Sequence, residues 1–133
     1  MYRSITVKIG SNVLTRPDRK LDLERISHLT DQIATLHKQG IKVILVSSGA
    51  VASGRGMVNH LPKKDPVSER QLLSSVGQIK LVSTYASLFE VHGITCAQVL
   101  VTKEDFRTRE HYLNMKNCLT TLLEHKIVPI INE

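Results

Sequence analysis

The stretch LVSSGAVASGRG, residues 45–56, contains three glycines, three serines and one arginine directly after a run of apolar residues. The apolar run covers residues 41–46 and is interrupted only by Lys42, which is typical of a strand in a parallel sheet with both faces covered. The small residues that follow lead into a helix expected to begin at residues 50–53. The stretch therefore predicts a strand, a tight turn and a helix, and the turn is the first candidate for ligand binding.

The alternation of strand and helix continues on both sides of this unit. Hydrophobic spacing predicts further strands and helices, the strands at residues 5–9, 94–101 and 127–131 and the helices at residues 21–39, 65–91 and 109–124. Asp22 and Asp65 are suited to cap two of these helices, and Gly40 supplies a left-handed end for the first. This order predicts an α/β fold in which a parallel sheet lies between helical layers.

Two features mark the neighbourhood of the long helix predicted at residues 65–91. Glycine and proline residues predict a loop before it, at residues 55–64. Gly77 then interrupts the helix, where a glycine is about 1 kcal/mol less favourable than alanine. We therefore expect a neighbouring element to pack closely against Gly77.

Composition limits the classes of function. A chain of 133 residues suits one α/β domain, and the absence of tryptophan with only 4% aromatic residues argues against nucleic-acid binding by base stacking. The formal net charge of +6 comes from basic residues spread along the chain, among them Lys8, Arg16, Arg19, Lys20, Lys42, Arg55, Lys63, Lys64, Arg70 and Lys80. Such a dispersed excess is compatible with an anionic small ligand and equally with a solvated surface.

Neither a metal centre nor a membrane segment is expected. Cys96 and Cys118 fit no metal-ligand spacing, and the histidines do not cluster, so no metal ligands are predicted. The sequence has no apolar span of membrane length and no signal peptide at its start, which predicts a cytoplasmic protein.

The turn at residues 48–50 has two interpretations. From Gly49 the sequence reads G-A-V-A-S-G-R-G, where a P-loop would need lysine and a hydroxyl residue in place of Arg55 and Gly56. Ser48, Gly49 and Ala50 nevertheless follow a strand and precede a helix, so free backbone N–H groups there favour an anion. The alternative is a tight turn that binds nothing.

A second candidate turn follows the first predicted strand, in the sequence VKIGSN. Lys8 interrupts this strand, and a lysine is costly to bury unless its ammonium group meets an anion. Gly10 and Ser11 then form a small turn that could face the same polyphosphate as Ser48. Alternatively, Lys8 extends into solvent from an edge strand. The shared-ligand hypothesis requires Lys8 and Ser48 to lie on the same side of the sheet.

Four segments together resemble the amino-acid kinase family: VKIGSNVLT, VSSGAVASGR, QLLSSVGQ and HYLNMKNCLTTLLEHKIVPIINE. They follow the family's order and spacing over essentially the whole chain. The resemblance implies a three-layer αβα sandwich with a mainly parallel sheet. It is greatest to the members that transfer the ATP γ-phosphate to the γ-carboxylate of L-glutamate, giving glutamyl 5-phosphate in the first step of proline biosynthesis, with Mg²⁺.

The resemblance also implies roles for individual residues. Residues of the first turn would contact the ATP phosphates, with Lys8 also stabilising the transferring phosphoryl group: Lys8, Gly10 and Ser11. Residues of the second turn and the last strand would bind the amino-acid substrate: Ser48, Gly49, Ala50 and Asn132. Because the attacking carboxylate is already an anion, catalysis would consist of positioning and charge neutralisation.

Several alternatives and expectations accompany this resemblance. The acceptor could instead be acetylglutamate, aspartate, carbamate or a nucleotide monophosphate, or the chain could be a non-catalytic half-domain. Because the sequence ends at Asn132-Glu133, directly after a strand, we expect residues 1–133 to be the N-terminal part of a kinase domain that is incompetent alone. The full-length protein is expected to bind small molecules, neither nucleic acid nor membrane, and to form a homo-oligomer.

Overall fold

The computed structural model describes residues 4–58 and 65–132. In this part of the chain four strands form one sheet in the order β1-β2-β4-β3, and every neighbouring pair is parallel. The strands are β1 (Ser4–Ile9), β2 (Lys42–Ser47), β3 (Cys96–Val99) and β4 (Val128–Asn132). The prediction of a parallel sheet is confirmed, and each strand overlaps the range expected for it.

Helices connect the strands in the order the sequence predicts. They are α1 (Ser11–Leu14), α2 (Leu23–Lys38), α3 (Ala50–Arg55), α4 (Pro66–Val91) and α5 (Arg109–Glu124), with a 3₁₀ turn, η1 (Lys103–Phe106), before α5. The side chains of Asp22 and Asp65 cap α2 and α4 as predicted. Arg55 closes α3 and is not part of a loop, while residues 59–64 of the predicted loop lie outside the described residues.

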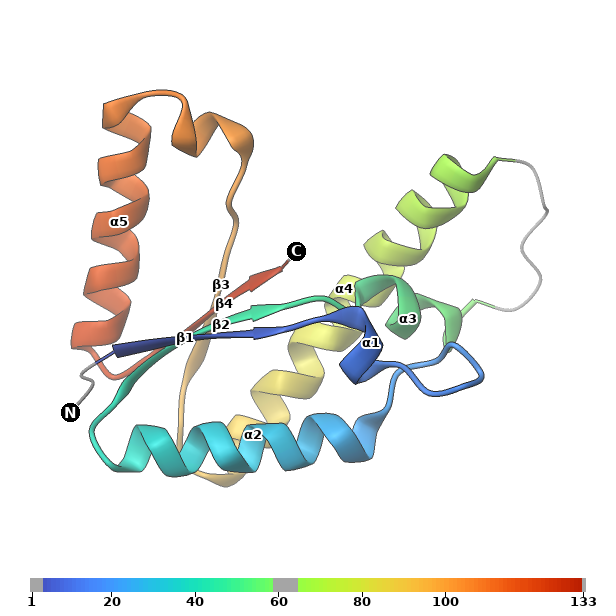
Figure 1. The fold of residues 1–133 in the computed structure, drawn as a ribbon, viewed down its shortest axis with the longest axis horizontal. Coiled ribbons are helices and arrows are strands. Elements are labelled where there is room, and N and C mark those ends of the chain that lie inside the picture. The colour runs from blue at the N-terminus through green and yellow to red at the C-terminus, as the bar shows by residue number, and fades with distance from the viewer. Residues whose placement is uncertain (1–3, 59–64, 133) are drawn as a thin grey trace.

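The helices cover the two faces of the sheet. The chain crosses the sheet in one direction from β1 to β2 and from β2 to β3, and then returns from β3 to β4. Right-handed crossovers therefore place α2 and α4 on one face of the sheet and α5 on the other. In Figure 1 the strands lie between α2 and α5. The three-layer αβα arrangement implied by the resemblance is confirmed.

The core lies mainly on the face of α2 and α4. Val43 and Leu45 of β2 point into it, together with Ile26 of α2 and Phe89 of α4, and all four are essentially inaccessible to solvent. The opposite face is less fully covered: α5 contains no buried residue and packs against β4, where Pro129 is buried. We expected both faces of β2 to be covered. The face of Val43 and Leu45 is fully buried, whereas Val46 on the opposite face is half-buried.

Gly77 lies where α4 crosses α3, as its position in the sequence predicted. A Cβ atom at Gly77 would lie 1.8 Å from the carbonyl oxygen of Ala50, and one at Gly54 would lie 2.0 Å from the carbonyl oxygen of Leu73. Neither distance leaves room for a methyl group. The two glycines therefore let the backbones of α3 and α4 touch, and this contact holds the start of α3 in place.

Within residues 4–58 and 65–132, no helix has both the length and the apolar composition needed to cross a membrane.

Candidate functional site

The carboxyl ends of three strands form one row at an edge of the sheet. Ile9 of β1 pairs with Ser47 of β2, and Ser47 pairs with Asn132 of β4. The backbone N–H of Ser48 donates a hydrogen bond of 2.9 Å to the carbonyl of Ile9, which extends the ladder one residue past β2. The turns that follow β1 and β2 are therefore neighbours, as a parallel sheet requires.

Strand alternation sorts the candidate residues between the two faces. Lys8 pairs with Val46, so their side chains share a face, and Ser48 lies two residues beyond Val46 on the extended ladder. Lys8 and Ser48 are thus assigned to the same face, whereas Asn132 shares the opposite face with Ser47. Lys8 is exposed on the edge strand β1. Its ammonium group therefore does not need an anion to offset a cost of burial.

A cavity of about 770 Å³ opens at this edge and brings the two turns together. Its lining includes Ser11, which follows β1, and Ser48, Gly49 and Ala50, which follow β2. Lys8, Gly10 and Asn132, the other predicted site residues, do not line it. The cavity is large enough for a small metabolite.

Gly49 gives the second turn its shape. Its φ angle of 114° lies in the left-handed region, which side chains strongly disfavour. A Cβ atom there would also lie 3.3 Å from side-chain carbons of Leu14 and Leu21. Glycine therefore allows β2 to pass directly into α3 and keeps the backbone of residues 48–50 at the cavity wall.

A buried hydrogen-bond relay fixes the carbonyl group of Ser48. The Ser47 hydroxyl donates to that carbonyl at 2.8 Å, and the Tyr85 hydroxyl lies 2.7 Å from the Ser47 hydroxyl. Because the Ser47 hydroxyl already donates its proton to the Ser48 carbonyl, the Tyr85 hydroxyl is the donor in the bond to Ser47. Burial raises the pKa of Tyr85 above its ordinary value. Tyr85 therefore helps to fix the backbone at Ser48, a contact that the sequence pattern did not reveal.

Replacing Tyr85 with phenylalanine is expected to lower the free energy of unfolding by about 1 kcal/mol, because a buried hydrogen bond is lost. Urea denaturation measures this change. Tyr112→Phe is the matched control, since Tyr112 is 45% exposed on α5 and its loss should change stability by less than about 0.5 kcal/mol. Equal stabilities for the two variants would contradict the relay.

Asn132 is the last described residue of β4 and lies at the carboxyl end of that strand, beside Ser47 of β2. Both polar atoms of the Asn132 amide are buried and have no hydrogen-bond partner among the described residues. A buried amide without partners is unfavourable by about 1–3 kcal/mol, so this position suits contact with a polar ligand.

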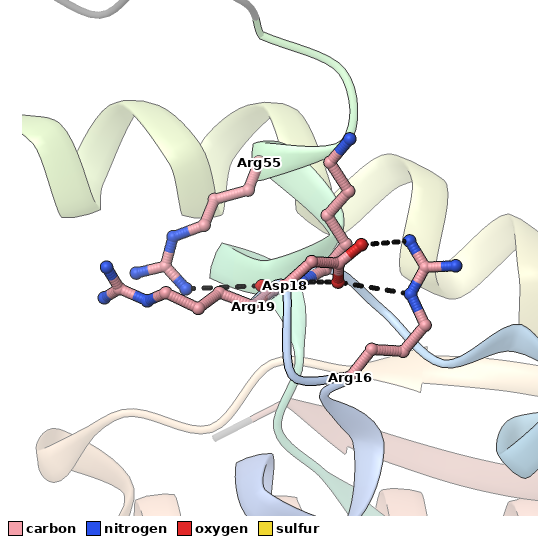
Figure 2. Close-up of polar contacts among 5 residues, drawn as sticks. Arg16, Asp18, Arg19 and Arg55 are labelled. Carbon is pink, nitrogen blue, oxygen red and sulfur yellow. Dashed lines mark hydrogen bonds and ion pairs between the residues drawn. The ribbon is translucent and has the colours of Figure 1, made fainter.

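Four charged side chains line the same cavity, and the sequence pattern did not single them out. They are Arg19, Arg55, Glu69 and Arg70. Arg55 donates a hydrogen bond of 3.5 Å to the backbone carbonyl of Arg19, and Figure 2 shows the two arginine side chains extending in the same direction. Partial burial lowers the pKa of Arg55, Arg19 and Arg70 lower it further, and Glu69 acts in the opposite direction. One wall of the cavity is therefore cationic.

A sequence model of the amino acid kinase family matches residues 4–133. The chain belongs to the amino acid kinase family. Two similar proteins, each named glutamate 5-kinase, come from Bacteroides thetaiotaomicron and Chlorobaculum tepidum and are 56% and 53% identical to it. The matches cover 99% and 100% of this chain but only 37% of each relative. A glutamate 5-kinase from Clostridium acetobutylicum is 42% identical over 97% of the chain and 48% of the relative.

Membership of the amino acid kinase family agrees with the position of the two turns, because ligands of open parallel α/β sheets generally bind at the carboxyl ends of the strands. It does not by itself account for the arginine wall. Arg19, Arg55 and Arg70 are far apart in the sequence and belong to a dispersed charge excess, so only their shared cavity distinguishes them from other surface arginines.

The described residues offer no ready site for the Mg²⁺ ion that the family resemblance implies. Among residues 4–58 and 65–132, no group of three or more histidine, cysteine, aspartate or glutamate side chains could hold a metal ion. The carboxylate of Glu69 lines the cavity, but the three arginines around it would repel a cation. No step of the reaction is therefore assigned to a metal held by these residues.

Proposed function

We propose that this chain forms part of a glutamate 5-kinase, which transfers the γ-phosphate of ATP to the γ-carboxylate of L-glutamate and yields glutamyl 5-phosphate, the first intermediate of proline biosynthesis. The observation that carries the proposal is the single cavity shared by the turns after β1 and β2. The names of the relatives support glutamate as the acceptor.

In this reaction the two turns hold the two reactants. The turn with Gly10 and Ser11 faces the ATP phosphates, and the turn of residues 48–50 holds the acceptor carboxylate against them. A carboxylate oxygen attacks the γ-phosphorus, the bond from that phosphorus to the β,γ-bridging oxygen breaks, and ADP leaves. The acceptor is already an anion, so no general base is needed, and the reaction depends on alignment and neutralisation of charge.

Lys8 supplies positive charge to the transferring phosphoryl group. An exposed ammonium group is strongly screened by water, so its contribution depends on the ATP and the acceptor excluding solvent from the site. Asn132, whose buried amide has no partner among the described residues, contributes a hydrogen-bonding group at the rim of the acceptor pocket. These roles are open to direct test by substitution.

We further propose that the isolated chain does not turn over, because the kinase relatives are much longer than the segment it matches. The remaining ligands of ATP, glutamate and Mg²⁺ would come from the part of those relatives that this chain does not cover. We also predict that the longer enzyme self-associates and is located in the cytoplasm.

The decisive experiment is a chimera in which this chain replaces the matching segment of the Bacteroides thetaiotaomicron relative, to which it is 56% identical over 132 residues. ADP release is measured with L-glutamate, acetylglutamate, aspartate, carbamate and UMP as acceptors. We expect turnover with L-glutamate and none above background for the isolated chain. Preference for another acceptor would favour a different family member, and a folded but inactive chimera would favour a non-catalytic half-domain.

A further inference from the structure

The cationic wall of the cavity gathers charges from three separate segments. Arg19 comes from the loop between α1 and α2, Arg55 ends α3, and Glu69 and Arg70 lie near the start of α4. Arg19 and Arg70 repel the guanidinium group of Arg55, whereas Glu69 attracts it. Three guanidinium groups and one carboxylate give this wall a net charge of two positive units.

No ion pair in the described part of the chain includes one of the three arginines, and Glu69 offsets only part of their charge. The ion pairs there join Arg16 to Asp18, Arg107 to Glu104 and His92 to Asp31, and none includes Arg19, Arg55 or Arg70. Among the residues that the structure describes, Arg55 donates to the backbone carbonyl of Arg19, and its side chain is half-buried. Like charges that repel one another at the wall of a cavity are stabilised when an anion binds between them.

Arg19, whose side chain lines this wall, has an unfavourable backbone conformation. Its φ angle is +69°, in the left-handed region that residues other than glycine seldom adopt. The Arg16–Lys20 backbone hydrogen bond of 2.8 Å and the Asp18 carboxylate, which Arg16 contacts in Figure 2, hold the loop in this shape. Strain of this kind persists where surrounding contacts enforce it and is concentrated at functional sites.

We propose that this wall binds the α-amino-acid head group of the acceptor: Arg19, Arg55 and Arg70 bind the α-carboxylate, and Glu69 binds the α-ammonium group. This inference rests on the proposed function, since the same cavity holds the reacting carboxylate at residues 48–50. Guanidinium groups match a carboxylate in charge and geometry, and a single carboxylate beside them matches the neighbouring ammonium. The chemical class recognised is an α-amino acid with a carboxylate in its side chain.

The test compares L-glutamate with glutarate, which has the same two carboxylates but no ammonium group. Binding to the isolated chain is followed by NMR titration. Arg55→Gln and Arg70→Gln should weaken both ligands about tenfold or more, because each loses a charge-assisted hydrogen bond. Glu69→Gln should weaken L-glutamate and strengthen glutarate, an opposite change that a merely structural role would not produce.

One control accompanies these variants. Arg107→Gln removes an exposed arginine that pairs with Glu104 at 2.8 Å outside the cavity, and it should leave both affinities unchanged. Of the two arginine test variants, Arg70→Gln should disturb folding less, because Arg70 is exposed on α4 and has no hydrogen bond or ion pair among the described residues, whereas Arg55 is half-buried. Amide spectra check that each variant is folded.

Three results would overturn the head-group assignment: no glutarate binding to the unmodified chain, affinities that the arginine variants leave unchanged, or inorganic phosphate that binds the arginine wall more tightly than glutarate. The chimera separates this proposal from the proposed function. If the chimera phosphorylates glutamate and the arginine variants leave its activity unchanged, the head-group assignment is wrong while the glutamate kinase assignment stands. If the chimera phosphorylates another acceptor while glutarate binding still depends on the arginines, the glutamate kinase assignment is wrong while the arginine wall remains a carboxylate site.

Discussion

Replacing Gly77 with alanine is expected to destabilise the chain by about 3 kcal/mol and to displace the start of α3. The added methyl carbon would lie 1.8 Å from the carbonyl oxygen of Ala50 and 2.4 Å from the backbone nitrogen of Gly54. Both are main-chain atoms, so no side-chain rotation can relieve the clash and the two helices must separate. Urea denaturation measures the loss, and amide chemical shifts of residues 48–50 report the displacement.

Gly56→Ala is the matched control for Gly77→Ala. Gly56 follows α3 with a φ angle of −74°, and a Cβ atom there would lie 3.5 Å from its nearest neighbour, an ordinary contact. This variant should change stability by less than about 0.5 kcal/mol. If the two variants unfolded at the same urea concentration, the close contact between α3 and α4 would not constrain the chain as the structure indicates.

Replacing Lys8 with methionine in the chimera is expected to lower kcat about 100-fold or more while leaving the folded stability within about 0.5 kcal/mol. Lys8 is exposed at the carboxyl end of β1, so its removal creates no cavity in the core. Its proposed contribution is made to the charge that develops on the transferring phosphoryl group, and methionine keeps the length of the side chain without that charge. Steady-state rates of ADP release at saturating ATP measure the effect.

Lys42→Met provides the comparison for Lys8→Met. Lys42 pairs with Ser4 at the opposite end of β1 and β2, and strand alternation assigns it to the same face of the sheet as Lys8. Its replacement removes the same charge at a distance from the two turns, and kcat should change less than about twofold. A Lys8→Met chimera as active as the Lys42→Met chimera would eliminate the phosphoryl-stabilising role.

Most of the fold could be predicted from the sequence because local signals agreed with one another. The helix at Arg109–Glu124 and the caps at Asp22 and Asp65 follow from hydrophobic spacing and helix-end chemistry, which are properties of a few consecutive residues. The prediction failed where such signals are short. The single turn α1 and the continuation of α3 to Arg55 have too few residues to show a period.

The candidate site was only partly predictable. The turn at residues 48–50 was anticipated from its small residues after a strand, and the cavity includes it. Of the two interpretations of Lys8, the structure supports exposure on an edge strand, and no consecutive-residue signal could decide between them because sheet order depends on distant segments. Tyr85, on α4, was not anticipated because its partner Ser47 is 38 positions away.

The amino-acid sequence alone determined that strands and helices alternate, where the helices begin, and that two small-residue turns follow β1 and β2. These features depend on interactions between residues close in the chain. Only the tertiary structure decided which charges share a cavity, which face each side chain occupies, and why Gly77 must lack a side chain. These outcomes depend on contacts between distant segments, and a dispersed set of arginines comes to line one cavity only through folding.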